Sequence, residues 1–392
     1  RIGGTCPAGS YLRGINADGS VVCEALLQPH VIKTVEDPGS TVVGTHTSIA
    51  IGWQGNPVIV HHDETNGDLR FLGCGNPTCA FTGGYAIDAS ANVVGLYPSI
   101  KVPADTLPVI SYFDDTANTL KVLKCGDPGC GGPSTITTVD DPPVGGVGEY
   151  SSLAIGADGL PVIAYYDQGL LSLKVAKCQT AACNGAVTIT QVDNPANTVG
   201  QYASLAIGTD GLPVVSYFDA TAGTLKVAKC GNAACNAGNT LTTVDDPANV
   251  VGDHTAIAVP ADGRPVIAYR DVTGGDLRVM KCGNAACTSG NVSNLVDNAF
   301  FVGQFTSVAI GADGLPVISY YHDIGRLKVA KCRDAACTPA ANIVSIVDSP
   351  LNTSVGRYTS IAVPADGLPI IAYHDLSNGA LKVAKCGNAA CQ

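Results

Sequence analysis

Residues 199–249 read VGQYASLAIGTDGLPVVSYFDATAGTLKVAKCGNAACNAGNTLTTVDDPAN, and variants of this unit fill most of the chain. Short apolar runs in it alternate with turn residues, which predicts four strands, over 203–208, 213–219, 225–230 and 240–245. The sequence Thr-Asp-Gly between the first two runs is typical of a tight hairpin turn. No stretch has apolar residues at helical spacing, so the unit is a four-stranded sheet.

The unit repeats seven times along the 392 residues. Each copy holds one C-x4-C pair, and the first cysteines of successive pairs lie 51, 53, 52, 52, 50 and 54 residues apart. Four-stranded units of this length in a long array are typical of β-propellers. We therefore predict an all-β, seven-bladed β-propeller with four-stranded blades. We number the strands of a blade first to fourth in chain order, and expect the first nearest the axis.

The last repeat stops at Gln392, soon after its cysteine pair, and so lacks a fourth strand. Residues 31–36, in VIKTVEDPG, match the fourth-strand pattern TTVDDPA and precede the first repeat. We predict that this N-terminal segment is the outer strand of the last blade. The expected division of the chain is a hairpin and linker over 1–29 and the propeller over 30–392.

Fourteen of the sixteen cysteines form the seven repeated pairs. Each pair spans one turn, so both sulfur atoms come within bonding distance. A zinc site would need two such pairs to converge, whereas a propeller places one pair on each blade. We therefore predict one hairpin disulfide per blade: Cys74–Cys79, Cys125–Cys130, Cys178–Cys183, Cys230–Cys235, Cys282–Cys287, Cys332–Cys337 and Cys386–Cys391.

Cys6 and Cys23 lie outside the repeats and flank an Asn-Ala-Asp-Gly turn, so we expect a further bridge between them. Their segment resembles the short C-P-x-G-S…D-G-S-V-x-C hairpins found ahead of larger modules in surface and tail-fibre proteins. So many paired cysteines fit an oxidising compartment, which predicts an extracellular or cell-surface protein. The chain begins at Arg1 rather than Met, so we expect that an export signal was removed.

The net charge of −11 argues against a nucleic-acid partner, which requires a basic surface. No uninterrupted apolar run is long enough to cross a membrane. The sequence contains no G-x-S-x-G, H-E-x-x-H or phosphate-loop motif. We therefore expect a binding or scaffold module rather than an enzyme, and no required cofactor.

Three positions recur in every repeat. The second strand ends in Asp, the fourth strand ends in an acidic residue, and an aromatic or His residue precedes the first strand. Such uniform residues usually support loops or pair with lysines of the third strand. The alternative is a set of repeated sugar or Ca²⁺ sites, because carboxylates and loop carbonyls suit Ca²⁺. The second-strand set is Asp63, Asp114, Asp167, Asp219, Asp271, Asp323 and Asp375, and the aromatic set is His46, Tyr97, Tyr150, Tyr202, His254, Phe305 and Tyr358.

Departures from the repeat are better candidates for a binding site. His62, His322 and His374 are expected at equivalent places on three consecutive blades, with His61 on the opposite face of its strand. Neighbouring blades are too far apart for these histidines to share a metal ion. Arg270 and Arg357 also break the pattern. The candidate ligand-binding residues are His46, His61, His62, Asp63, His322, Arg357, Tyr358, His374 and Asp375.

The units LPVISYFD, over 107–114, and LKVAKCGNAAC, over 225–235, resemble the repeat of secreted seven-bladed propeller proteins of bacteria. The resemblance covers residues 30–392, implies the fold and an extracellular setting, and brings no catalytic residues. Our expectation is a secreted or cell-surface binding or scaffold module, part of a filament, layer or appendage, whose partner is a surface protein, a glycan or another copy of itself. The alternatives are a lectin-like propeller and a propeller hydrolase or lyase.

Overall fold

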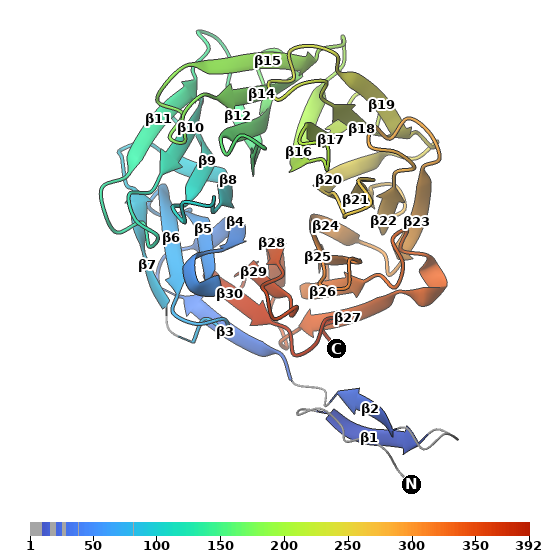
Figure 1. The fold of residues 1–392 in the computed structure, drawn as a ribbon. Coiled ribbons are helices and arrows are strands. Elements are labelled where there is room, and N and C mark those ends of the chain that lie inside the picture. Colours follow the sequence, from blue (N-terminus) through green and yellow to red (C-terminus); the bar gives the residue numbers. More distant parts are fainter. Residues whose placement is uncertain (1–9, 16–20, 26–28, 38, 81) are drawn as a thin grey trace.

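A computed structural model describes residues 10–15, 21–25, 29–37, 39–80 and 82–392. Residues from 29 onward form seven four-stranded antiparallel sheets arranged as blades around a central axis (Figure 1). The predicted fold class, an all-β propeller with four-stranded blades, is confirmed. Within the described residues the helices are two 3-10 turns, η1 (Trp53–Gly55) and η2 (Pro339–Ala341), and no helix has the length and hydropathy of a membrane span.

Blades 1 to 7 follow the order of the chain, and within each blade the strands run from the axis outward. The first strands are β4 (Val43–Ile51), β8 (Val94–Lys101), β12 (Val147–Ile155), β16 (Val199–Ile207), β20 (Val251–Ala258), β24 (Val302–Ile310) and β28 (Val355–Ala362). The second strands are β5 (Pro57–Asp63), β9 (Val109–Asp114), β13 (Pro161–Asp167), β17 (Pro213–Asp219), β21 (Val266–Asp271), β25 (Pro316–His322) and β29 (Ile370–Asp375).

The third strands are β6 (Asp68–Cys74), β10 (Thr119–Lys124), β14 (Ser172–Cys178), β18 (Thr224–Lys229), β22 (Asp276–Lys281), β26 (Arg326–Lys331) and β30 (Ala380–Lys385). The outer strands are β7 (Thr82–Asp88), β11 (Thr135–Asp140), β15 (Val187–Asp193), β19 (Thr240–Asp245), β23 (Val292–Asp297), β27 (Ile343–Asp348) and β3 (Val31–Glu36). A separate hairpin pairs β1 (Ser10–Ile15) with β2 (Val21–Ala25). Cys6 and the Asn-Ala-Asp-Gly turn lie outside the described residues, so the Cys6–Cys23 bridge stays a prediction.

The ring closes as predicted. Strand β3 pairs antiparallel with β30, with Ile32 opposite Ala384, and so completes blade 7 from the N-terminal side. Glu36, at the end of β3, accepts a hydrogen bond from His61 Nε2 of blade 1 at 2.9 Å. The N-terminal segment therefore joins the last blade to the first.

Apolar residues form seven clusters, and each cluster lies between two neighbouring blades. Between blades 7 and 1, for example, Ile49 and Ile59 pack with Ile370 and Leu381. Burial of this surface between blades is the main force that holds the ring. The small residues of the first strands add hydrogen bonds to it: in six of the seven interfaces a first-strand Ser Oγ accepts from a backbone N–H of the next first strand, as Ser204 does from Ile257 at 3.1 Å.

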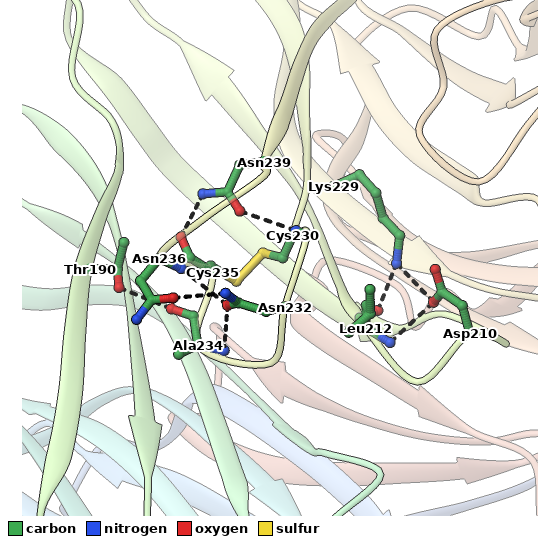
Figure 2. Close-up of a disulfide and its surroundings, with 11 residues drawn as sticks. Thr190, Asp210, Leu212, Lys229, Cys230, Asn232, Ala234, Cys235, Asn236 and Asn239 are labelled. Carbon is green, nitrogen blue, oxygen red and sulfur yellow. Dashed lines mark hydrogen bonds and ion pairs between the residues drawn. A yellow bond between two sulfur atoms is a disulfide. The ribbon is translucent and has the colours of Figure 1, made fainter.

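The seven predicted blade disulfides are all present, with Cα–Cα distances of 4.6–5.0 Å. The second cysteine of each pair has a left-handed φ of 50–57°, a conformation that residues other than Gly rarely adopt. In blade 4 the loop closed by Cys230–Cys235 also contacts the neighbouring blade, because Thr190 of β15 donates to the Ala234 carbonyl at 2.9 Å (Figure 2). The disulfide therefore fixes a loop that links two blades.

On the same face, the lysine before the first cysteine holds the turn between the first two strands. Lys229 Nζ contacts Asp210 Oδ1 at 2.9 Å and the Leu212 carbonyl at 3.0 Å (Figure 2). Blades 2 to 7 all contain this pair. Blade 1 has Gly73 in place of the lysine and the 3-10 turn η1 in place of the aspartate turn, so both partners are replaced together.

Candidate functional site

The first strand of each blade carries an aromatic or His residue next to the axis. These residues are not in the loop before the strand, as the sequence indicated, but inside the strand at a β-bulge: in blade 4, Tyr202 and Ala203 together oppose Tyr217 alone. The seven residues have φ between 49° and 53°, a left-handed conformation that is strained for bulky side chains. They are His46, Tyr97, Tyr150, Tyr202, His254, Phe305 and Tyr358, which we call the axial ring.

The axial ring is closed. The centroids of neighbouring side chains lie 4.5–4.8 Å apart at all seven junctions, within the range of favourable aromatic contacts. With the residues that follow its members, the ring lines a cavity of about 170 Å³ on the axis. This volume is below the roughly 300–1,000 Å³ of most small-molecule sites, so the cavity suits a single small group of a larger ligand.

The ring presents no charge near neutral pH. Burial lowers the pKa of His46 to about 3, with smaller contributions from His62 and His374. Burial likewise lowers the pKa of His254 to about 3, so both histidines are neutral. Burial raises the pKa of the tyrosine hydroxyls of Tyr97, Tyr150 and Tyr202. The cavity wall is therefore neutral, with aromatic edges and hydroxyl groups, and any charge at the site must come from residues around the ring.

Those residues differ from blade to blade. The position before each ring member pairs with the next-to-last residue of the second strand, as Gln201 does with Phe218. Most of these pairs are apolar or uncharged. Charges occur in blade 3 (Glu149), in blade 5 (Asp253 with Arg270) and in blade 7 (Arg357 with His374).

Blades 7 and 1 bring several polar side chains together beside the axial ring. The His46 ring lies 4.5 Å from Tyr358 and 6.5 Å from His62, and Tyr358 lies 6.3 Å from His374. Arg357 precedes Tyr358 and stacks over the Tyr321 ring at 5.4 Å. Its Nε is buried without a hydrogen-bond partner. We call His46, His62, Arg357, Tyr358 and His374 the blade 7–1 sector.

The two outer histidines of this sector have a defined hydrogen-bonding state. His62 Nδ1 lies 2.8 Å from the Val94 carbonyl, and His374 Nδ1 lies 2.9 Å from the Val43 carbonyl. A carbonyl only accepts, so Nδ1 carries the hydrogen in both rings. Burial lowers the pKa of both histidines, which leaves their Nε2 atoms as acceptors near neutral pH. The Nε2 atom of His374 is buried and has no partner.

The sector contains five of the nine candidate residues from the sequence. His61 lies on the opposite face of β5 from His62. Its Nδ1 accepts a hydrogen bond from the Gly44 amide at 3.1 Å, and its Nε2 donates to Glu36 between blades 7 and 1. Burial would raise the pKa of Glu36, but hydrogen bonds from His61 and Arg70 lower it. Asp63 and Asp375 accept from the backbone of their own loops, as Asp63 does from Asn66 at 3.0 Å.

His322 is not equivalent to His62 and His374, contrary to our expectation. His322 pairs with Val302. In blade 4 the equivalent residue, Val199, pairs with Asp219, so His322 occupies the position of the second-strand Asp. The loop after β25 is one residue shorter than that of blade 4, so His322 replaces the second-strand Asp and Asp323 lies beyond the strand. Because side chains alternate along a strand, this single-residue shift sends His322 to the opposite face from His62.

The repeated carboxylates take structural partners. The fourth-strand Asp of one blade accepts from the second-strand Tyr of the next, as Asp193 does from Tyr217 at 2.7 Å. Six interfaces contain this bond, and Glu36 with His61 makes the seventh. Among the described residues, no three His, Cys, Asp or Glu side chains gather in a way that could hold a metal ion.

Two residues near the axis escaped the sequence analysis. Burial raises the pKa of Asp253 to about 7, against the lowering effect of Arg270, and its Oδ1 has no hydrogen-bond partner. Lys101 lies on a first strand where the other blades have Ala. An alignment of the seven first strands alone would have revealed both, since Gln201 and Gln304 occupy the Asp253 position.

No protein-family model and no curated protein sequence matches the chain. Solved structures match its fold. One is a polysaccharide lyase, an ulvan lyase, with a TM-score of 0.61 at 12% identity, over 89% of this chain and 95% of that one. The NanB sialidase of Streptococcus pneumoniae has a TM-score of 0.52 at 10% identity, over 91% and 70%. These identities show the shared propeller fold alone, and the specific repeat family stays a prediction.

Proposed function

We propose that the chain is an extracellular binding module that recognises an acidic glycan at the blade 7–1 sector. The observation that carries this proposal is the arginine beside the axial ring. Arg357 has a buried Nε without a partner, and no carboxylate of the described residues lies within ion-pair distance of it. A guanidinium binds a carboxylate or sulfate oxygen pair through two parallel hydrogen bonds.

The surroundings of Arg357 suit a sugar with an acidic group. The Nε2 acceptors of His62 and His374 can receive hydrogen bonds from sugar hydroxyls. The adjoining cavity, about 170 Å³ and lined by aromatic edges, suits the apolar face of one sugar ring. The seven disulfides support an extracellular location, where such polysaccharides occur. Propellers among the matching structures include a polysaccharide lyase and a sialidase, which supports a glycan as the ligand.

The repeat provides a matched test. Arg357→Gln installs the residue that blades 4 and 6 have at this position, Gln201 and Gln304. We expect the native chain to bind uronate-containing or sulfated oligosaccharides in preference to neutral ones, and the variant to lose at least about tenfold in affinity. Arg333→Gln, an exposed arginine beside the disulfide of blade 6, is the control for net charge. Equal affinities of the two variants, or a flat response to all acidic glycans, would rule the proposal out.

A second candidate is a polysaccharide lyase at the same sector. It is favoured by the neutral His62 and His374, whose free Nε2 atoms could remove a proton from a bound sugar. The substitutions that test it are His62→Phe and His374→Phe. The ring should accept both, because blades 2 and 4 have Phe113 and Phe218 at this position. Appearance of an unsaturated sugar product with the native chain, and its loss in either variant with retained binding, would establish the lyase.

Self-assembly into a filament or layer remains a proposal that a size measurement of native material tests. A single monomeric species at high concentration would count against it.

A further inference from the structure

Blade 5 carries two opposite charges at the position beside the axial ring. Asp253 of β20 pairs with Arg270 of β21 across the blade. The corresponding pair of blade 4 is Gln201 with Phe218, and the pairs of the remaining blades hold no second case of an acid opposite a base. Blade 4 shows that an uncharged pair fits this position, so the fold itself does not require the charges.

The two charged side chains lie close together without a hydrogen bond between them. Arg270 Nη1 is 3.8 Å from Asp253 Oδ2, whereas the ion pair of Lys174 with Asp167 in blade 3 closes to 2.7 Å. Asp253 is 8% exposed, and its buried Oδ1 has no partner among the described residues. The buried Arg270 Nε likewise has none. A buried polar group without a partner costs free energy, which a ligand with both a donor and an acceptor would recover.

The pair adjoins the axial cavity. Asp253 directly precedes His254 and Thr255, which both line this cavity. The side chains of Asp253 and Arg270 keep 12% and 15% of their surface exposed, so a small group can reach them. In the axial ring Phe305 alone separates His254 from Tyr358, with centroid distances of 4.8 and 4.5 Å. One blade therefore lies between this pair and Arg357.

The loop that precedes β24 packs against Arg270 and exposes two aromatic residues. A Cβ atom at Gly303 would lie 3.5 Å from Arg270 Cβ. Phe300 and Phe301 of the same loop are 68% and 58% exposed. The Asp323 amide donates to the Phe301 carbonyl at 3.0 Å and holds the loop. Hydrogen-bonding groups and apolar rings on adjoining segments suit a sugar, which combines hydroxyls with an apolar face, better than a simple ion.

We propose that Asp253 and Arg270 form a second sugar subsite, which binds two neighbouring hydroxyls of a neutral sugar residue. The Asp253 carboxylate accepts a hydrogen bond from one hydroxyl, and Arg270 Nε donates to the oxygen of the other. The inference rests on the proposed function, because one glycan would place its acidic unit at Arg357 and a neutral unit here. The preferred ligand is then a polysaccharide that contains both kinds of unit.

The repeat provides a matched test. The double variant Asp253→Gln, Arg270→Phe installs the Gln–Phe pair of blade 4 and leaves the net charge unchanged, so its melting temperature should not fall. The probes are uronate-containing oligosaccharides and the same sugars after reduction of their carboxylates to alcohols. We expect the double variant to lose at least about tenfold in affinity for both forms in calorimetry, because two hydrogen bonds to charged groups are lost.

Leu96→Gln is the control, since it gives blade 2 the same Gln–Phe pair and should bind like the native chain. Arg357→Gln should weaken binding of the uronate form and leave binding of the reduced form unchanged. A loss in the double variant alone would therefore support this subsite and contradict the site at Arg357, and a loss in Arg357→Gln alone would do the reverse. Native affinity of the double variant for both forms would overturn the inference and show that water alone satisfies the pair.

Discussion

The two faces of the ring differ in how strictly they repeat. On the face with the disulfide loops, Lys–Asp pairs and loop contacts recur from blade to blade with nearly the same distances. On the opposite face, the residues beside the axial ring change from Gln and Phe in blade 4 to Arg and His in blade 7. Parts that hold the ring must satisfy every interface, whereas a binding site needs one sector. The difference therefore separates the residues that maintain the fold from those available for a ligand.

The strongest way to break the repeated part is to open the ring. Deletion of residues 29–36 removes β3, exposes the edge of β30 and leaves the interface between blades 7 and 1 incomplete. We expect the melting temperature to fall by at least about 10 °C in calorimetry. Deletion of residues 1–28 is the control and should have little effect. An unchanged melting temperature in the first variant would show that β3 does not stabilise the ring.

On the variable face, Asp253→Gln installs the residue of blades 4 and 6. The native pKa of about 7 exceeds the usual value of an aspartate, so the folded state binds this proton more tightly than the unfolded state. Its stabilisation is present at acidic pH and is lost as the pH rises from about 4 through 7. The variant should therefore gain up to about 4 kcal/mol at pH 8 relative to pH 4 in urea titrations. A net loss at pH 8 would mean that the contact of Asp253 with Arg270 outweighs the burial.

The axial ring responds to pH in the opposite direction. The pKa of His46, about 3, lies below the usual value of histidine, so the unfolded state binds the proton more tightly. The resulting loss of stability begins as the pH falls below about 6.5. His46→Tyr, the residue of four other blades, should remove up to about 3 kcal/mol of destabilisation at pH 4 and change little at pH 8. Tyr150→His should make the ring more sensitive to acid, and the same urea titrations check both variants.

The smallest effect expected is the loss of one disulfide from the repeated face. Replacement of Cys230 and Cys235 by Ser should lower the free energy of unfolding by about 2 kcal/mol, because the bridge closes a short loop. Denaturant unfolding with and without the substitution measures the difference. If the contact between Thr190 and Ala234 persists without the bridge, the loss should be smaller than this value.

The sequence predicted the features that depend on spacing alone: the number of blades, the disulfides within them and the closing strand. It placed the start of the first strand at residue 203, but β16 begins at Val199, because the bulge at Tyr202 lets a strand continue through a left-handed residue. It also misplaced His322. The loop after β25 is one residue shorter than that of blade 4, so the Tyr-His-Asp motif of blade 6 lies one residue further along its strand than the same motif of blade 7. Spacing along the chain could not reveal which residues approach each other across the axis.

The pairing of β3 with β30, which closes the ring, has a consequence for synthesis. The strand that closes the ring is the first propeller strand along the chain, whereas its partner β30 is the last of them, so the two are made at different times. Until then β3 has an unpaired edge, blade 1 lacks one neighbour, and the chain is a growing row of stacked sheets rather than a circle. The ring therefore cannot close until β30 has been made, and closure marks the moment at which every blade of the propeller is present.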